Sequence, residues 1–166
     1  MTGDARGTAA ADRTAVDCEI RIAARPETVF TFFTDPEKMV RWKGIAAELD
    51  PRPGGLYRVD INGRDVARGE YVVVEPPNRV VISFGWEGDG DNPVPPGSTT
   101  LEVTLRPEAG GTLLRLSHSD LPVPVAPGHL EGWGHYLSRL MIAGNGGDPG
   151  PDVWMEKVKE EVAGGA

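Results

Sequence analysis

The sequence predicts an α+β fold, in which a curved antiparallel sheet of about six to seven strands wraps around one long C-terminal helix. Three observations lead to this prediction. Segments with period-two alternation fill the middle of the chain, a single long window of helical periodicity lies near its C-terminal end, and two short helical segments follow the first alternating segment. Strands and helices that are segregated along the chain favour an α+β architecture with a helix on one face of the sheet.

The N-terminal part combines a polar stretch, one strand and two short helices. Residues 1–14 are small and polar, which predicts a disordered leader, and the alternation over Val16–Ala24 predicts the first strand. Pro26 suits the first turn of a helix. The apolar stripe of that helix consists of Val29, Phe30 and Phe33. Asp35-Pro36 ends it and begins a second short helix, which we expect to end at Gly44.

The central segments alternate between apolar and polar residues, so each is predicted to turn one side toward the core. The predicted inward sets are Tyr57, Val59 and Ile61, then Ala67, Gly69, Tyr71 and Val73, then Val80, Ile82, Phe84 and Trp86, and finally Leu101, Val103 and Leu105 facing Leu114, Leu116 and His118. Arg58 and Arg68 fall on the other side and are predicted to be sheet-surface charges. The acidic loop over residues 87–97 is predicted to be flexible and solvated, and its position also suits a lid over the interior.

The long helical window contains "EGWGHYLSRL", residues 131–140, in which two glycines flank Trp133. Each glycine inside a helix costs about 1 kcal/mol relative to alanine. The predicted sheet-facing stripe consists of Leu130, Trp133, Leu137, Leu140 and Met141. The spacing places Gly134 on this stripe, where a missing side chain lets the helix approach the sheet or leaves volume beside the indole. Gly132 falls on another face, and the spacing gives no reason for it.

Composition limits the class of protein. The chain of 166 residues predicts one domain, which we place at residues 15–146, followed by a tail over residues 147–166 with the pattern of a short helix. The formal net charge of -8 argues against nucleic acid and anionic membrane as partners. A single cysteine, Cys18, excludes an intrachain disulfide. Without a secretory leader or a run of eighteen apolar residues, we expect a cytoplasmic protein with no membrane span.

Five segments carry a resemblance to a known family. They are "ARPETVFTFFTDPEKMVRW", "PRPGGLYRVDI", "ARGEYVVVEPPNRVVISFGW", "STTLEVTLRPEAGGTLLRLSHSDLP" and "EGWGHYLSRL". In this order and spacing they resemble the START-like or SRPBCC superfamily, which has the helix-grip fold of the birch pollen allergen. Within it, the sequence is most similar to the branch named after the activator of a heat-shock chaperone ATPase, the AHSA-type domain.

The resemblance implies a function in the space between sheet and long helix. Similar members bind hydrophobic small molecules, including lipids, in a cavity there. Some relatives are cyclases, aromatases or hydrolases, and some sequester a toxic compound. The branch name implies stimulation of a chaperone, an activity of larger eukaryotic members with an additional N-terminal domain to which no segment of this sequence corresponds.

The inward residues nearest to this cavity form the expected ligand-binding set. Its members are Phe33, Trp42, Tyr57, Val59, Tyr71, Phe84, Trp86, Leu116, His118, Trp133, Leu137 and Met141. Most are apolar, and we expect about half of the aromatic side chains to touch the ligand, because pockets combine apolar walls with a few polar groups. The polar tips in the set belong to Tyr57, Tyr71 and His118.

His118 is the one candidate for catalysis, at the inward end of a strand beside the expected cavity mouth. It either contacts the ligand as a hydrogen-bond partner or general base, or it is a core histidine with satisfied ring nitrogens. No nucleophile elbow accompanies it. His129 and His135 are six residues apart on one helix and face different sides, so no metal site or cofactor is expected. We expect His135 to pair with Glu131 on the outer helix face.

Three functional hypotheses remain open from the sequence. The first is a non-enzymatic protein that binds a hydrophobic or aromatic small molecule, which we favour over the other two. The second is a cyclase, dehydratase or hydrolase that uses His118 or a pocket tyrosine as acid or base. The third is an interaction module with an exposed apolar patch around Val153, Trp154 and Val158 in the tail. The same tail is compatible with packing back on the domain or with a homodimer contact.

Overall fold

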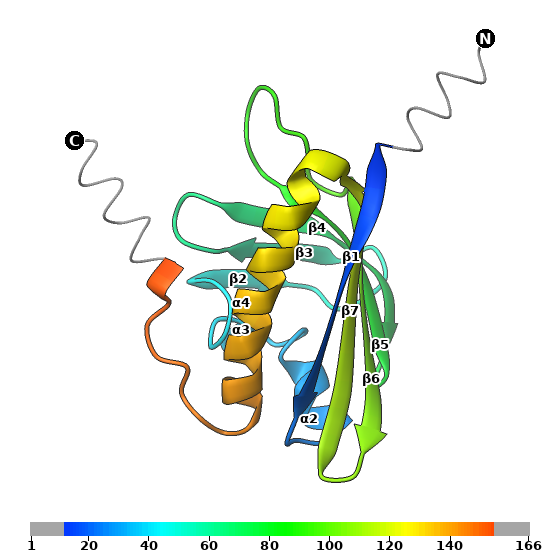
Figure 1. The fold of residues 1–166 in the computed structure, drawn as a ribbon, viewed down its shortest axis with the longest axis vertical. Coiled ribbons are helices and arrows are strands. Elements are labelled where there is room, and N and C mark those ends of the chain that lie inside the picture. Colours follow the sequence, from blue (N-terminus) through cyan, green and yellow to red (C-terminus); the bar gives the residue numbers. More distant parts are fainter. Residues whose placement is uncertain (1–11, 155–166) are drawn as a thin grey trace.

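A seven-stranded antiparallel sheet curves around one long helix, as Figure 1 shows. The computed structural model describes residues 12–154. Its elements are β1 (Arg13–Ile22), α2 (Pro26–Thr31), α3 (Pro36–Met39), β2 (Ala46–Leu49), β3 (Leu56–Asp60), β4 (Val66–Glu75), β5 (Arg79–Trp86), β6 (Thr99–Glu108), β7 (Gly111–Pro122), the 3-10 turn η1 (Val123–Val125) and α4 (Ala126–Gly144). The strand order is β1-β7-β6-β5-β4-β3-β2. The predicted α+β helix-grip architecture is confirmed.

The N-terminal elements differ from the prediction at two boundaries. Strand β1 begins at Arg13, so the last two residues of the predicted leader belong to the sheet, and residues 1–11 of that leader lie outside the described part. The second short helix ends at Met39 rather than at Gly44. The chain turns sharply after Met39, and Gly44 takes a φ of +93°, which a regular helix does not contain.

The inward faces of the strands follow the predicted alternation. Strands β6 and β7 pair Leu101 with His118, Val103 with Leu116 and Leu105 with Leu114, so the two predicted inward sets face each other. The prediction that Val73 faces the core was wrong. The register of β4 against β5 shifts between Tyr71 and Val73, so one extra residue intervenes and Val74, instead of Val73, packs against the core.

The helix α4 turns a different stripe toward the sheet from the one predicted. Its buried residues are Ala126, Trp133, Tyr136, Leu137, Leu140 and Ala143. Leu130 is 44% exposed and Met141 is 36% exposed, so these two predicted stripe residues were wrong. At 100° per residue the buried stripe is centred near Tyr136 and Leu140, about a quarter turn from Leu130 and Met141.

The same rotation reverses the roles of the two glycines that flank Trp133. Gly134 is exposed, and a Cβ built on it would have no atom within 4 Å, so the prediction that it faces the sheet was wrong. Gly132 is half-buried, and a Cβ on it would meet only the Trp154 ring, at 3.9 Å. Gly132 therefore lies on the inner side of the helix.

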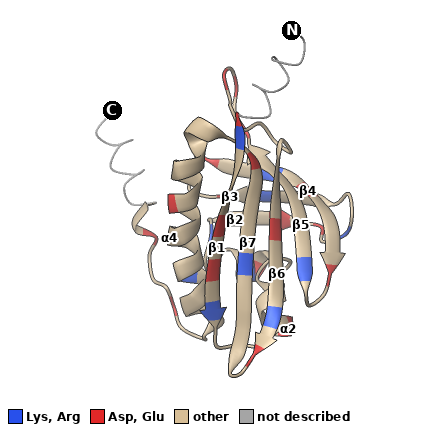
Figure 2. Ribbon diagram, turned by 45° about the vertical axis from the view of Figure 1, so that its right-hand side comes forward, with Lys and Arg blue, Asp and Glu red and all other residues tan. Residues whose placement is uncertain are grey.

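Charged side chains cover the convex face of the sheet, where Figure 2 shows blue and red positions on neighbouring strands. Glu19 on β1 accepts from Arg115 on β7 at 2.6 Å. Arg58 and Arg68 both pair with Glu87, at 2.8 and 3.2 Å, as expected of sheet-surface charges. Such exposed pairs contribute little to stability, about 0–1 kcal/mol each, and mainly keep this face polar. No helix within residues 12–154 is long and apolar enough to cross a membrane.

Helices α2 and α3 close one end of the space between sheet and α4. Helix α2 contacts β6 and β7, whereas α3 contacts β2 near the other sheet edge (Figure 1). Asp35 caps α3 by accepting the Glu37 backbone N–H at 2.9 Å. The turn after α3 then returns the chain to the sheet through Gly44. A Cβ at Gly44 would lie 2.7 Å from the Asp60 carbonyl oxygen and 2.8 Å from Val59 Cγ1.

We predict that Gly44→Ala lowers the free energy of unfolding by about 2–4 kcal/mol, because it combines a left-handed backbone with these two close contacts. Gly63→Ala is the matched control. Gly63 has a φ of +85°, but a methyl group added to it would have no atom within 4 Å, so only the backbone cost of about 1–2 kcal/mol applies. Urea unfolding followed by circular dichroism compares the two variants, and equal losses would contradict the role given to the contacts.

Candidate functional site

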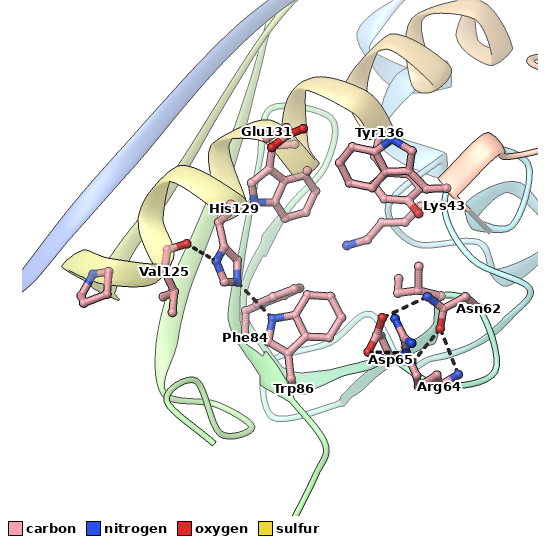
Figure 3. A pocket seen from close by; sticks show the side chains of 16 residues that line it. Lys43, Asn62, Arg64, Asp65, Phe84, Trp86, Val125, His129, Glu131 and Tyr136 are labelled. Atoms are coloured by element: carbon pink, nitrogen blue, oxygen red, sulfur yellow. Dashed lines mark hydrogen bonds and ion pairs between the residues drawn. The ribbon is translucent and has the colours of Figure 1, made fainter. Parts of the chain in front are cut away.

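A pocket of about 710 Å³ lies between the N-terminal half of α4, the β3–β4 hairpin and the end of β5 (Figure 3). Helix α4 contributes Gly128, His129, Glu131, Gly132, Trp133 and Tyr136, strand β5 contributes Phe84 and Trp86, the β3–β4 turn contributes Ile61, Asn62, Arg64 and Asp65, and Lys43, Pro124, Val125 and Trp154 complete the wall. Of these helix residues, Trp133 and Tyr136 belong to the buried face, whereas Gly128 and Glu131 are exposed at the pocket rim. Five aromatic or imidazole rings from α4 and β5 dominate this wall.

The structure divides the predicted ligand-binding residues into three groups. Phe84, Trp86 and Trp133 line the pocket. Eight others are packed in the core away from it: Phe33, Trp42, Tyr57, Val59, Tyr71, Leu116, His118 and Leu137. Met141 lies on the outer side of α4. Among these core residues, Phe33 packs against Trp42 and its carbonyl accepts from Tyr71, whereas His118 lies directly behind the pocket wall, bonded to Trp133.

Hydrogen bonds to backbone carbonyls satisfy the polar atoms of two of these core aromatic residues. Tyr71 Oη donates to the Phe33 carbonyl at 2.7 Å, and Trp42 Nε1 donates to the Phe32 carbonyl at 3.1 Å. Burial raises the pKa of both Tyr57 and Tyr71 far above their ordinary value, so both phenols are neutral. These aromatic residues stabilise the core and leave the pocket wall to others.

His118 is fully buried, behind the pocket wall instead of at its mouth. Trp133 Nε1 carries a hydrogen that it can only donate, and it lies 3.0 Å from His118 Nδ1. His118 Nε2 therefore carries the ring proton and donates to Thr99 Oγ1 at 2.7 Å, and Thr99 Oγ1 donates to the Phe84 carbonyl at 2.7 Å. This hydrogen-bonded chain joins α4 to β7, β6 and β5.

Both ring nitrogens of His118 are thus engaged, which corresponds to the satisfied core histidine and leaves no lone pair for a ligand. Burial, followed by the nearby His129 and Lys43, lowers the pKa of His118 to about 3. The neutral ring is favoured in the folded state, so its contribution to stability is present above pH 6.5 and is lost as the pH falls from 6.5 toward about 3. A general base at neutral pH would need an accessible nitrogen, which His118 does not offer.

The other two histidines also contact tryptophans. Trp86 Nε1 donates to His129 Nε2 at 3.0 Å, so the neutral His129 ring carries its proton on Nδ1 and donates to the Val125 carbonyl at 2.8 Å. His135 stacks on Trp154 with ring centres 4.2 Å apart. No cluster of three or more metal-ligating side chains occurs within residues 12–154.

The first residues of the tail pack back on α4. Asp152 accepts from His135 Nε2 at 2.8 Å and from Tyr136 Oη at 2.7 Å, so the predicted pair of His135 with Glu131 was wrong. Burial acts to raise the pKa of Asp152, but hydrogen bonds from Tyr136, His135 and the Trp154 backbone outweigh it and leave this pKa lowered. These contacts hold Trp154 in the pocket wall.

The acidic loop does not cover the pocket. None of its residues 87–97 belongs to the pocket wall, and Val94 is buried in the core with an exposure of 1%. Trp86 N donates to the Val94 carbonyl at 2.8 Å, and Asn92 Nδ2 donates to the Trp86 carbonyl at 2.6 Å. The loop is therefore anchored to the end of β5, in contrast to the flexible lid that the sequence suggested.

Lys43 is the functional candidate that the sequence reasoning missed. Its side chain is 3% exposed and lines the pocket, into which its amine points in Figure 3. Lys43 Nζ lies 4.2 Å from the centre of the Trp133 ring and 5.0 Å from that of Phe84. It is the one buried side-chain nitrogen or oxygen without a hydrogen-bond partner among the described residues. Lys43 is one of only four lysines among the 17 basic residues of the chain. This scarcity is the one feature of the sequence that distinguishes it.

The burial of Lys43 controls its protonation. Removal from water disfavours the ammonium and lowers the pKa of Lys43 to about 7, from an ordinary value of 10.5. The two aromatic faces partly stabilise the cation, by about 0.5–2 kcal/mol each, but they provide no counter-charge. The unfolded chain binds more protons than the folded one between these pKa values. The free energy of unfolding therefore rises as the pH increases from about 7 to 10.5. Below about pH 7 the amine is charged in both the folded and the unfolded state, and the folded protein bears the full cost of burying the charge.

Comparison with known proteins identifies the family of the sequence. The family described as "Activator of Hsp90 ATPase homolog 1-like protein", AHSA1, matches over residues 23–143, about three quarters of the chain. Among curated proteins, none matches the sequence. The matched range runs from the end of β1 through most of α4 and contains most of the pocket residues.

Solved structures agree with this match. The chain is 48% identical to an AHSA1-like protein from Rhizobium etli, with a TM-score of 0.67 over 84% of this chain and 87% of that one. CalU16 from Micromonospora echinospora is 30% identical, with a TM-score of 0.62 over 76% and 73% of the two chains. DynU16, a protein in the dynemicin biosynthetic locus, is 23% identical with a TM-score of 0.70, and the chain spans half of its length. This last likeness shows a common fold alone.

We predict that Thr99→Val lowers the free energy of unfolding by about 1–3 kcal/mol, because it leaves the buried His118 Nε2 without an acceptor. Thr100→Val is the matched control on the same strand, since Thr100 bonds to the exposed Asp120 carboxylate at 3.2 Å. Urea unfolding at neutral pH measures both. An equal effect of the two substitutions would argue against the buried chain.

We also predict that Lys43→Met raises the free energy of unfolding near neutral pH by about 1–3 kcal/mol, because it removes a buried amine that has no partner. The variant should lack the rise in stability that the wild type shows between about pH 7 and 10.5. Lys38→Met serves as control, since Lys38 Nζ donates to Thr31 Oγ1 at 2.8 Å near the surface. A less stable Lys43→Met protein with an unchanged pH profile would contradict this account.

Proposed function

The chain belongs to the AHSA1 family, and from this premise we propose that it binds an apolar, aromatic small molecule in the pocket beneath α4. The observation that carries the proposal is the pocket itself. Its volume of about 710 Å³ lies within the range of about 300–1,000 Å³ that is typical of small-molecule sites. Its position between sheet and long helix is also the place where the family resemblance leads us to expect a ligand.

The chemistry of the wall supports an aromatic ligand. Trp86, Trp133 and Phe84 present ring faces and edges from two elements, and Trp154 adds a third side. Trp86 and Trp133 are held by hydrogen bonds from their indole nitrogens to His129 and His118. Rings that are already fixed lose little entropy when a ligand packs against them, so such a wall favours flat apolar molecules.

Two glycines of α4 support the proposal from the helix side. Gly128 and Gly132 are one turn apart and both line the pocket, Gly132 half-buried and Gly128 at the exposed rim. A side chain at either position would project into the space that we assign to the ligand. The helical cost of Gly132, about 1 kcal/mol, is accounted for if this space is needed for binding.

Catalysis is not part of the proposal. His118 has both ring nitrogens engaged, and Tyr57 and Tyr71 lie in the core. Tyr136 lines the pocket, but its hydroxyl donates to Asp152, and burial together with this bond raises its pKa well above the ordinary value. None of these four side chains therefore offers the pocket an atom that is free to donate or accept a proton.

The interaction hypothesis has less support. It expected an exposed apolar patch around Val153, Trp154 and Val158. Val153 is 61% exposed, but Trp154 stacks on His135 and packs against the core, and Val158 lies outside the described residues. Of the alternatives for the tail, these contacts support packing back on the domain.

We predict that Gly132→Leu lowers the affinity for Nile red, an uncharged aromatic dye, by about tenfold or more, because the new side chain occupies the pocket. The matched control is Gly134→Leu, two residues away on the same helix, whose side chain would point into open solvent. Titration of the dye fluorescence measures both affinities. Equal binding by the two variants would argue against this pocket as the site.

A second measurement identifies the natural ligand. Native mass spectrometry of the protein purified from its own host is expected to show a co-purified small molecule, which should be absent from the Gly132→Leu protein. If no molecule co-purifies and a panel of hydrophobic probes that includes Nile red fails to bind, the binding proposal is wrong.

A further inference from the structure

The inner end of the pocket holds an amine for which residues 12–154 supply no anion. Lys43 Nζ has no hydrogen-bond partner among the described residues, although more than nine tenths of its side chain is buried. It lies over the faces of Trp133 and Phe84. Buried charges in proteins are nearly always paired, because an isolated ion loses its hydration without compensation.

The acidic side chains of the pocket do not fill this role. Asp65 accepts from Asn62 Nδ2 at 3.0 Å in the β3–β4 turn and lies 3.7 Å from Arg64. Glu131 belongs to the pocket rim on α4 and is exposed. Neither carboxylate makes an ion pair with Lys43, so no side chain of residues 12–154 neutralises Nζ, and a ligand can supply the anion.

The other cationic or titratable groups around the pocket either have hydrogen-bond partners within the protein or lie at the pocket rim. His129 Nε2 and His118 Nδ1 accept from Trp86 and Trp133, and the Tyr136 hydroxyl donates to Asp152. Arg64 is at the rim, with half of its side chain exposed. Lys43 is therefore the buried cationic group at the inner end, and it has no hydrogen-bond partner within residues 12–154.

We propose that the ligand of this pocket is an aromatic acid, whose anionic oxygen, a carboxylate, phenolate or enolate, pairs with the Lys43 amine while its ring system packs against Trp86 and Trp133. This inference rests on the proposed binding function and adds the chemical class of the ligand. One proton is taken up when the neutral amine becomes an ammonium on binding the anion. The two aromatic faces on one side of the amine and the anion on the other then replace the water that the buried cation has lost.

The preference for an acid follows from the geometry of the site. An uncharged ligand leaves Lys43 Nζ buried without a partner, and the cost of that burial remains in the complex. An anion removes this cost and adds a charge-assisted hydrogen bond, which corresponds to about a ten- to hundredfold gain in affinity. The pKa of Lys43, lowered by burial to about 7, lets the apo amine exist without its proton at little cost.

The test compares β-naphthoate with β-naphthamide, which differ in charge and hardly in shape. Isothermal titration of the full-length protein at about pH 8, in two buffers with different ionisation enthalpies, gives both the affinity and the protons exchanged. We expect naphthoate to bind about tenfold or more tightly than the amide, with uptake of roughly one proton. In Lys43→Met, both the preference and the proton uptake should disappear while naphthamide still binds.

Two further variants keep the result interpretable. Arg64→Gln removes the rim cation and should leave the preference for naphthoate unchanged, so a preference that disappears in Arg64→Gln and persists in Lys43→Met overturns the inference. Lys43→Gln offers a second neutral side chain if the methionine variant does not fold. Equal binding of acid and amide by the wild type also overturns the inference but leaves the proposed function intact. Failure of Nile red and both naphthalene probes to bind the wild type overturns the proposed function.

Discussion

The hydrogen-bonded chain from Trp133 through His118 and Thr99 to the Phe84 carbonyl fixes the helix to the sheet. Each of its three bonds is buried, so a displacement of α4 would leave a donor or acceptor without water and without a partner. Apolar contacts alone tolerate small shifts, whereas this chain specifies one height and one rotation of the helix. The rotation buries Tyr136 and Leu140, places Gly132 in the pocket wall and leaves Leu130 and Met141 outside.

The strands and their inward residues could be predicted because alternation is a local property that each strand carries in its own sequence. That the inward residues of β6 face those of β7 followed from the same alternation. The helix rotation was predicted less well, because Leu130 and Met141 are as apolar as the residues that are buried. Its true rotation depends on Trp133 meeting His118, a contact between segments whose relative position the sequence does not give.

The candidate site was predictable in outline and not in its chemistry. The aromatic residues at the end of β5 and in α4 were anticipated, since both segments were expected to face the interior. Lys43 could not be, because it follows α3 in a turn where no period distinguishes inside from outside. Its direction depends on Gly44, whose left-handed backbone was expected only as a helix end. The tail residue Trp154 also required the tertiary contacts of Asp152 with α4.

The distribution of tryptophan has an optical consequence. The chain contains four tryptophans, and three of them, Trp86, Trp133 and Trp154, line the pocket, while Trp42 is enclosed in the core. Indole emission depends on the polarity around the ring, so most of the intrinsic fluorescence of the protein originates at the wall of one cavity. The protein therefore carries its own spectroscopic probe of that cavity, and Trp42 supplies an internal reference whose surroundings a molecule in the pocket does not touch.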